Sequence, residues 1–399
     1  MAEPKAPADP DDGDPPSPAT GDPLRMRPLL RYFLGLGMWG FGGPIASVGY
    51  MQRDLVERRG WLGRQDFLDG VALGQTMPGP LAAQVSMWVG YLASGAAGAA
   101  AVAAAFILPS FLFVLGVAAV YVRYSGLSAL QALFYGISPA VMAIIAVSAV
   151  KLARLTDRRD RRLWAITVLV GLVTAVTGTE VALLFVAAGL LMLLWDAPPA
   201  FLGGAGGSLT AWVVVPAVGS FGTLAAPGAT LVALALFFAK AGAFIFGSGL
   251  AIVPFLREGV VNQHHWLSER QFLDAVAMGL ITPGPVVITA TFIGYLVGGL
   301  AGGVVTTLAI FTPIYLGVIV PGRWFVRHRA NRQIKAFVSG ATAAAAGAIA
   351  GATVVLVRQA VVDVPTAVIA LLGLALLWRW KVKEPLLVLG GALAGLLLH

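Results

Sequence analysis

The clearest shortage in this 399-residue chain is a shortage of charge. Only 12% of its residues are charged, whereas 58% are hydrophobic and the mean hydropathy is +0.84. Soluble domains carry about 25% charged residues. A chain with so little charge cannot cover a surface that faces water, so the composition excludes a soluble globular protein and predicts an integral membrane protein.

The chain also has no cysteine, which excludes disulfide bonds, thiolate metal sites and cysteine nucleophiles. Its four histidines, His264, His265, His328 and His399, do not have the spacing of metal ligands. The sequence contains no recognisable Ser-His-Asp set, nucleotide-binding glycine motif or carboxylate cage for a metal. It therefore predicts a protein that is not an enzyme and that holds no cofactor or metal.

Residues 1–27 differ from the rest because they are acidic and Pro-rich and contain almost no large apolar side chain. Such a composition predicts a disordered tail. A secretory signal peptide begins with basic residues followed directly by an apolar core. The tail lacks that pattern, so the first hydrophobic helix is expected to direct membrane insertion.

Long uncharged runs make up most of the remaining chain. No Asp, Glu, Lys or Arg occurs from Gly70 to Val122, which is long enough for two crossings of about 20 residues each. The runs are continuous and do not alternate with period two, so they predict helices and not barrel strands. Basic residues cluster between the runs, as is typical of cytoplasmic loops and not of a nucleic-acid-binding surface.

An internal repeat divides the chain into two halves, because four motifs recur in the same order 205 residues later. Four matches in one register indicate a tandem duplication. We predict a first membrane repeat over residues 28–196, a linker over residues 197–229 with room for one crossing, and a second membrane repeat over residues 230–399. The matched motifs are Phe41-Gly42-Gly43 with Phe246-Gly247-Ser248, Trp61 with Trp266, Phe67-Leu68-Asp69 with Phe272-Leu273-Asp274, and Pro78-Gly79-Pro80 with Pro283-Gly284-Pro285.

The basic loops predict that the two repeats have opposite orientations in the membrane. The basic loop of the first half, residues 151–162, follows its fourth helix, whereas that of the second half, residues 323–335, follows its third. Opposite charge bias in equivalent loops is typical of an inverted repeat. Arg53 and Arg58 oppose this assignment because it places them on the outer side. The predicted fold is an all-α polytopic membrane protein with two inverted helical repeats.

The two Pro-Gly-Pro motifs are predicted to break their helices. Their prolines remove amide donors and clash with the preceding turn, and the glycine between them permits unusual backbone angles. Paired broken helices mark the substrate site of many transporters, and a helix that starts at a break favours an anion. A packing kink is the alternative. The predicted substrate-binding residues here are Pro78, Gly79, Pro80, Pro283, Gly284 and Pro285, with the hydroxyls of Thr76 and Thr282 as donors.

Other candidate residues rest on weaker patterns. Gly42, Gly43, Gly247 and Ser248 permit close approach of a substrate, with close helix packing as the alternative. Lys240 is a lone cation in an apolar helix, where it costs at least about 2.5 kcal/mol; it either lines an anion pathway or extends to the interface. Asp69 and Asp274, the only acidic residues matched by the repeat, are candidates for proton coupling. Stabilisation of the first helical turn is their alternative role.

The combined glycine-rich, Trp, Phe-Leu-Asp and Pro-Gly-Pro pattern of residues 30–398 resembles the long, two-domain form of the chromate ion transporter family. The resemblance implies export of chromate through the inner (plasma) membrane, driven by membrane potential or a proton gradient, and chromate resistance. It also implies antiparallel domains and competition by sulfate. Ser248-Gly249 stands where the first half has Gly43-Pro44, so the two sites need not be equivalent.

Two other functions remain open on the sequence. One is transport of a different anion such as sulfate, and the other is a membrane scaffold without a transport cycle. The expected partners are chromate, and sulfate as a competitor, together with the lipid bilayer and no nucleic acid. The sequence leaves the oligomeric state open, with a homodimer as one option.

Overall fold

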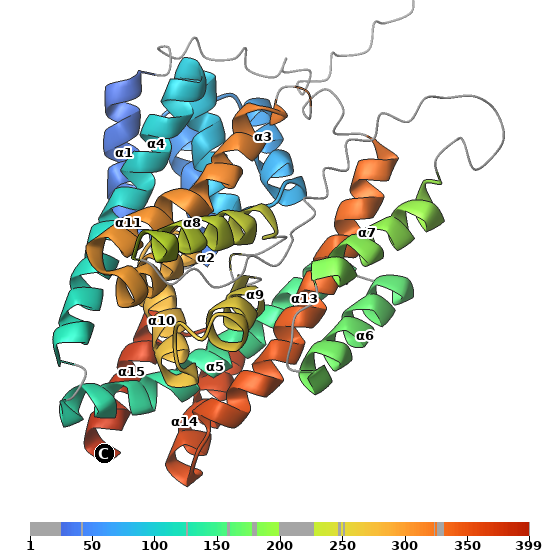
Figure 1. The fold of residues 1–399 in the computed structure, drawn as a ribbon. Coiled ribbons are helices and arrows are strands. Elements are labelled where there is room, and N and C mark those ends of the chain that lie inside the picture. Colours follow the sequence, from blue (N-terminus) through green and yellow to red (C-terminus); the bar gives the residue numbers. More distant parts are fainter. Residues whose placement is uncertain are drawn as a thin grey trace, which may run out of the picture.

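Helices form the described parts of the molecule, and no strand occurs among them (Figure 1). The all-α membrane fold predicted from the apolar runs is confirmed. Residues 1–24 of the predicted tail, residues 199–226 of the predicted linker, and Gly42, Gly247 and Ser248 lie outside the described residues. The computed structural model describes residues 25–40, 43–124, 127–157, 160–177, 182–198, 227–245, 249, 252–322, 324 and 331–398.

The described helices follow the same order in the two halves up to their longest members. The first half contains α1 (Met26–Trp39), α2 (Gly43–Met51) with a π-helical turn Gln52–Arg58, α3 (Arg64–Thr76), α4 (Leu81–Tyr124), α5 (Ser128–Asp157), α6 (Arg161–Thr177) and α7 (Ala182–Asp196). The second half contains α8 (Pro227–Ala243), α9 (Ile252–Arg257) with a π-helical turn Glu258–Gln263, α10 (Glu269–Ile281), a 3-10 turn Val286–Ile288, α11 (Thr289–Ile319), α13 (Arg332–Ala360), α14 (Val364–Ala375) with a π-helical turn Leu376–Trp380, and α15 (Glu384–Leu398).

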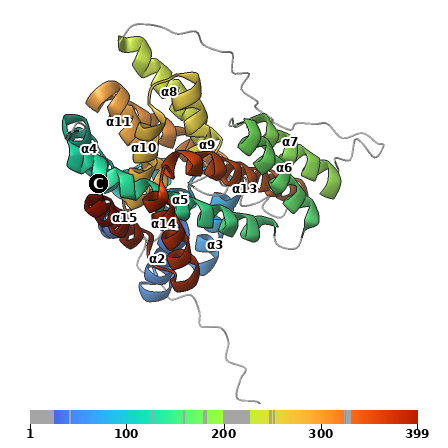
Figure 2. The same cartoon turned by 90° about the horizontal axis from the view of Figure 1, so that it is seen from below.

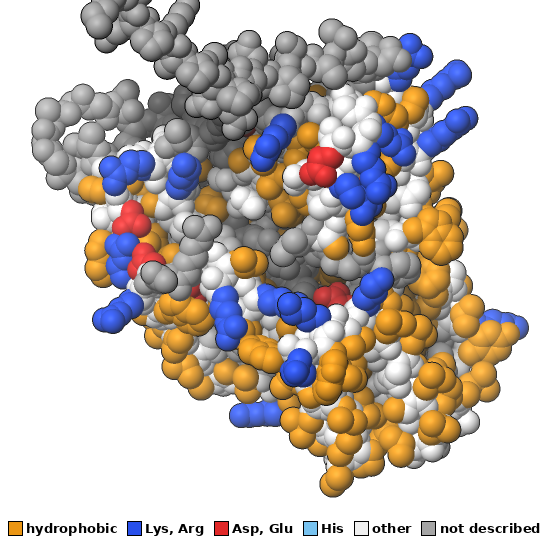
Figure 3. All heavy atoms as spheres, turned by 180° about the vertical axis from the view of Figure 1, so that it is seen from behind, with side chains coloured by type: hydrophobic (Ala, Val, Ile, Leu, Met, Phe, Trp, Pro, Cys, Tyr) orange, Lys and Arg blue, Asp and Glu red, His pale blue; other side chains and the backbone are white. Residues whose placement is uncertain are grey.

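Several described helices are long and apolar enough to cross a membrane, and they carry exposed leucine, valine and phenylalanine side chains. Figure 3 shows a broad hydrophobic surface over one part of the molecule, with the basic side chains gathered elsewhere. Apolar side chains on the outside of a helical bundle suit contact with lipid. The candidate spans are Leu81–Tyr124, Gln131–Asp157, Val286–Ile319 and Arg332–Ala360.

Two of these long helices contain a tight turn and fold back on themselves. In α4 the turn lies at Ser94 and at Gly95, which has φ +61°. After the turn the chain runs beside its own preceding segment, so closely that a Cβ added at Gly98 would lie 2.2 Å from the carbonyl oxygen of Gly90. Glycine permits both the positive φ and the close approach. Residues 81–93 and 96–124 of α4 are therefore two antiparallel segments.

The second half repeats this turn at the matching place. Gly299 has φ +58°, and a Cβ added at Gly302 would lie 2.1 Å from the carbonyl oxygen of Gly294. The hydroxyl of Thr306 donates to the carbonyl of Ala290 at 2.8 Å. Residues sixteen apart lie about 24 Å apart along a straight helix. The contact therefore requires residues 289–297 and 300–319 of α11 to run antiparallel.

The segment before each turn also forms a hairpin with the helix that precedes it. The indole nitrogen of Trp88 donates to the carbonyl of Asp66 at 2.9 Å, and a Cβ at Gly74 would contact Leu81. Helix α3 and residues 81–93 of α4 thus run antiparallel, and we call them the first hairpin. The run from Gly70 to Val122, which was predicted to hold two crossings, contains the end of α3, the second arm of the first hairpin and the long segment after the turn at Gly95.

The second hairpin consists of α10 and residues 286–297. A Cβ added at Gly279 of α10 would lie 1.9 Å from the hydroxyl oxygen of Thr289, so these two arms pack through a glycine as the arms of the first hairpin do. The Pro-Gly-Pro motifs join the arms. We call Pro78, Gly79 and Pro80 the first tip, and Pro283, Gly284 and Pro285 the second tip.

Equivalent helices of the two halves pack in the same way. A Cβ at Gly37 of α1 would lie 2.2 Å from the carbonyl oxygen of Phe106 in α4, and one at Gly242 of α8 would lie 2.1 Å from that of Ile310 in α11. Gly242 lies 205 residues after Gly37 and Ile310 lies 204 residues after Phe106, so both pairs match the offset of the sequence repeat to within one residue. Beyond this repeated unit, α13 lies beside α6 and α7 at one side of the molecule (Figure 1 and Figure 2).

Candidate substrate site at the hairpin tips

The chain leaves helical geometry at both tips. Helix α3 ends at Thr76 and α4 begins at Leu81, while α10 ends at Ile281 and the next helical turn begins at Val286. Each tip contains two prolines, which lack the amide hydrogen that a continuous helix needs. Gly79 has φ +142° and Gly284 has φ +103°, angles that other residues rarely adopt. The sequence of each tip therefore forces the turn between the hairpin arms.

Each tip packs against the opposite half of the molecule. The amide of Gly79 donates to the carbonyl of Ile245 at 2.6 Å, and a Cβ on Gly79 would lie 3.0 Å from Ile314 of α11. The hydroxyl of Ser110 in α4 donates to the carbonyl of Pro283 at 2.5 Å. Each hairpin thus reaches across the boundary between the halves.

Gly249 lies between the two hairpins. A Cβ added there would lie 3.8 Å from Pro80 of the first tip and 3.5 Å from Val286, directly after the second tip. Gly249 is therefore close to both hairpins. In the first half, the counterpart of the second glycine-rich segment begins α2 at Gly43.

The positive ends of two helices lie at this place. The first amide groups of a helix have no partner within the helix, and the backbone dipoles add a partial positive charge there. Helix α4 starts at Leu81, directly after the first tip, and the helical turn at Val286 directly follows the second tip. These two helix starts make the tips electrostatically suited to a negatively charged group.

The hydroxyl groups predicted to serve as donors already have acceptors. Thr76 donates to the carbonyl of Ala72 at 2.8 Å, and Thr282 donates to that of Met278 at 2.6 Å. A hydroxyl has one hydrogen, so in this conformation neither has one left for a bound anion. Thr76 and Thr282 therefore close the last turns of α3 and α10.

Lys240 lies in the last turn of α8 and is half-buried. Its ammonium nitrogen lies 5.9 Å from the ring centre of Phe255 in α9, which is a cation–π distance. Among the described contacts, none joins Lys240 to a tip. The structure thus places this predicted anion ligand on the neighbouring aromatic ring.

The two matched aspartates lie one turn deeper than expected. Asp69 and Asp274 are in the second turns of α3 and α10, and the start of α10 is capped by Ser268 and not by an aspartate. The alternative role in the first helical turn is therefore wrong. Asp69 is 9% exposed and accepts a hydrogen bond from Gln65 at 2.8 Å.

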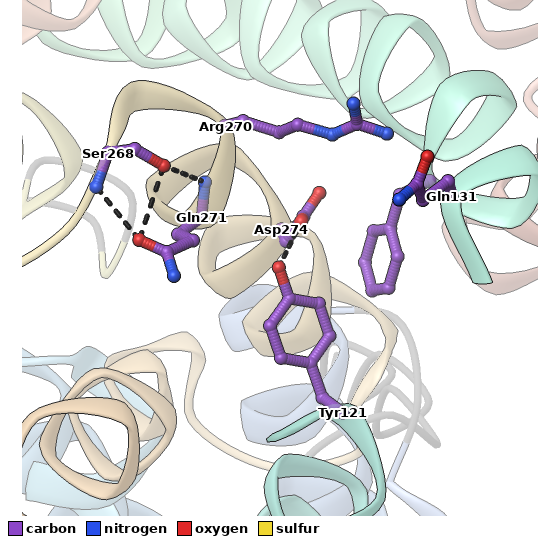
Figure 4. A pocket seen from close by; sticks show the side chains of 7 residues that line it. Tyr121, Gln131, Ser268, Arg270, Gln271 and Asp274 are labelled. Carbon is purple, nitrogen blue, oxygen red and sulfur yellow. Dashed lines mark hydrogen bonds between the residues drawn. The ribbon is translucent and has the colours of Figure 1, made fainter. Parts of the chain in front are cut away.

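Asp274 has a different environment. It is 2% exposed and accepts one hydrogen bond from the hydroxyl of Tyr121 at 2.7 Å, while its Oδ1 atom has no hydrogen-bond partner among the described residues. Figure 4 shows the carboxylate, Tyr121 and Gln131 around a pocket of about 300 Å³. Burial raises the pKa of Asp274 to about 7, because desolvation disfavours the charged form.

The chain is similar in sequence to known transport proteins along nearly its whole length. The family model described as chromate transporter matches residues 27–211 and 232–396. A chromate transport protein of Cupriavidus metallidurans is 48% identical over 384 residues, which is 95% of each chain. The chain belongs to the chromate transporter family.

Other members of the chromate transporter family also match nearly the whole chain. A probable chromate transport protein of Synechococcus elongatus is 47% identical over 93% of this chain and 95% of its own length. A chromate transport protein of Pseudomonas aeruginosa is 30% identical over 94% of this chain and 93% of its own length. No solved structure matches this chain. Its apolar helices and its membership of this family show that the chain is a multi-pass membrane protein. Its relatives are named as transport proteins.

The sequence did not predict which polar side chains bond the two tips and Asp274. The amide nitrogen of Gln84 donates to the carbonyls of Met77 and Pro78 at 3.2 and 2.9 Å, so it closes the first tip. Ser110 and Tyr121 act across much longer separations in the sequence. Their polarity within an uncharged apolar run is a signal that they have partners, but the sequence does not say which.

Proposed function

We propose that this chain is a secondary active transporter of the inner membrane that exports chromate and so confers chromate resistance. Membership of the chromate transporter family supports the substrate, as do three relatives named for chromate transport. The observation that carries the mechanism is that Gly249 contacts Pro80 and Val286, one from each hairpin. Two helix starts therefore meet between two halves, which is where transporters built from repeats bind their substrates.

The substrate site that we propose is the space around the tips. A tetrahedral, doubly charged oxyanion accepts hydrogen bonds from the free amides at the start of α4 and at the start of the helical turn at Val286. The glycine-rich segments that contain Gly42, Gly43, Gly247 and Ser248 complete the site. Lys240 adds positive potential from α8 without direct contact. The two repeats then rock against each other so that the site opens to one side of the membrane at a time.

The membrane potential alone is able to drive export. Moving one charge across the membrane changes the free energy by about 2.3 kcal/mol per 100 mV, and chromate carries two negative charges. Because the cytoplasm is negative, outward movement of chromate is favourable. A proton that Asp274 carries inward in exchange for each chromate adds a second driving force, and the buried carboxylate of Asp274 lines a pocket that gives access to such a proton.

Transport into inverted membrane vesicles tests this proposal. The lumen of such vesicles corresponds to the cell exterior, so an imposed lumen-positive potential is expected to increase chromate accumulation severalfold over vesicles that lack the protein. Uptake that equals the control without the protein would show that it does not transport chromate. Chromate uptake that changes neither with the membrane potential nor with a pH difference would contradict the proposed coupling of export to these two driving forces.

The same assay distinguishes the alternative substrate. Sulfate has the same shape and charge as chromate, so the site geometry fits both. If sulfate transport is faster and chromate only competes weakly, sulfate becomes the assigned substrate. A non-transporting scaffold predicts accumulation of neither anion.

A further inference from the structure

A large basic pocket lies at the beginning of α1, next to the loop before α3. Its volume is about 850 Å³, and Figure 3 shows a cluster of Lys and Arg side chains at one corner of the molecule. No acidic residue is among those that line it in the described part of the chain. The lining residues are Arg25, Met26, Arg27, Pro28, Arg31, Tyr32, Arg59 and Trp61.

Local structure explains how the arginines come together. Arg27 and Arg31 are four residues apart on α1, so they lie on one face of the helix. The guanidinium of Arg59 lies 4.5 Å from the ring centre of Trp61 and 5.3 Å from that of Tyr32. Stacking on two rings holds this planar group in place, and several like charges near one another disfavour the empty pocket.

Among the described residues near the pocket, Asp54 pairs with two arginines outside it and also interacts electrostatically with Tyr32, which lines it. Asp54 lies 3.1 Å from Arg53 and 3.7 Å from Arg58, neither of which lines the pocket. Helix α1 also has no acidic residue in its first turn and no side-chain cap. Its first free amides therefore add positive polarity to that of the arginines.

The second half shows that the fold does not require this basic pocket. At the equivalent positions α8 has Thr230, Val232 and Leu236, where the first half has Arg25 directly before α1 and Arg27 and Arg31 within it. His264 and Trp266, the counterparts of Arg59 and Trp61, stack at 4.3 Å and pack against Phe237. The same backbone arrangement is thus filled by neutral rings in one half and lined by arginines in the other.

We propose that the basic pocket binds a phosphate-type oxyanion, separately from the substrate site at the tips. Guanidinium groups donate pairs of parallel hydrogen bonds to such oxygens. The volume exceeds that of one small ion, so it also accommodates the glycerol part of a phospholipid headgroup. Two sources supply this chemistry: an anionic lipid headgroup at the membrane surface, and a free oxyanion from solution.

Ligand-dependent thermal stability of the purified full-length protein tests the site. The probes are phosphatidylglycerol, phosphatidylcholine as the neutral lipid, and inorganic phosphate. The variant is Arg27→Gln/Arg31→Gln, whose side chains are exposed, so we expect it to fold. Arg358→Gln/Arg379→Gln removes the same charge from exposed positions outside the pocket and is the matched control.

The wild type and the control are expected to show a saturable rise in melting temperature with phosphatidylglycerol or phosphate, and none with phosphatidylcholine. The pocket variant should need at least about tenfold more ligand, which corresponds to about 1.4 kcal/mol. A response to phosphatidylglycerol alone assigns a lipid headgroup, and one to phosphate assigns a free oxyanion. Equal responses of the pocket variant and the control, or no response of the wild type, would overturn the proposal.

This outcome is independent of chromate transport. If the pocket variant loses ligand binding but transports chromate normally, the pocket is a site in its own right. Loss of phosphate binding together with a raised KM for chromate would show that the same pocket also collects substrate. Failure of chromate transport in the wild type would leave the binding result unaffected.

Discussion

Asp69 and Asp274 occupy equivalent places in the two halves, yet their surroundings among the described residues differ. Asp69 accepts a hydrogen bond from Gln65 on its own helix, whereas Asp274 accepts one from Tyr121 of the other half, and its Oδ1 atom has no partner among the described residues. The counterpart of Gln65 is Arg270, which lines the pocket. The carboxylate at this position is thus hydrogen-bonded within its own helix in the first half, whereas in the second half it has an oxygen that can accept a proton.

The backbone features of the two halves differ far less. Both tips contain a glycine at positive φ, both long helices turn at a glycine, and both first helices pack through a glycine against a carbonyl group. The two halves therefore share the residues that the backbone geometry requires. Side chains that only touch solvent, ligands or the other half are free to differ.

The largest expected effect comes from the tip glycines, where the halves are most alike. Gly79→Ala and Gly284→Ala each place a methyl group at positive φ, which costs about 1–3 kcal/mol. The added Cβ would also lie 2.8 Å from Gln84 or 2.3 Å from the Ser110 hydroxyl. We expect each variant to reduce chromate accumulation in inverted vesicles at least about tenfold.

Gly116→Ala and Gly317→Ala are matched controls, because a Cβ at either helical position meets nothing within 4 Å. Both should transport like the wild type at equal expression. A tip variant that retains full transport would show that its half does not contribute a binding element, and the comparison of equivalent tips would fail there.

A smaller effect should separate the two aspartates. The raised pKa of Asp274, about 7, compares with about 3.9 for an unfolded chain, so the folded protein binds this proton more tightly. Stability from this group is therefore present at low pH and is lost as pH rises toward 7. Asp274→Asn should flatten the fall in melting temperature between pH 5 and pH 8, whereas Asp69→Asn should retain it.

The rate of chromate transport, measured between pH 5 and pH 8, also distinguishes the two aspartates. The hydrogen bond from Tyr121 stabilises the charged carboxylate, so Tyr121→Phe should move the inflection to higher pH. If Asp69→Asn flattens the profile and Asp274→Asn does not, the assignment of the titrating half is reversed.

The smallest effect is expected at Lys240, which has glycine as its counterpart in the first half. Its ammonium group contacts Phe255 and not a tip, so Lys240→Gln removes a cation–π contact worth about 0.5–1 kcal/mol and part of the positive potential. We expect KM for chromate to rise about threefold with little change in kcat, and Lys240→Arg to behave like the wild type. Complete loss of transport would place the lysine in direct contact with the substrate.

The sequence predicted much of the fold because the membrane limits the options. Backbone groups in lipid must bond within a helix or a closed barrel, so long apolar runs without alternation specify helices. The repeat likewise identified Pro78–Pro80 and Pro283–Pro285 as interruptions, since proline removes a donor wherever it stands. The hairpins were not foreseen, because whether a chain crosses or turns back depends on contacts such as that of Trp88 with Asp66.

Local residue chemistry determined, from the sequence alone, where helices form, where they stop and which residues correspond between the halves. Only the tertiary structure decided which of these residues meet. In the tertiary structure the Thr76 and Thr282 hydroxyls donate to their own helices, Gly249 lies between the two hairpins, and Asp274 lines a pocket. The physical reason is that helix formation and interruption depend on neighbours a few residues away, whereas burial and partners depend on packing between distant segments.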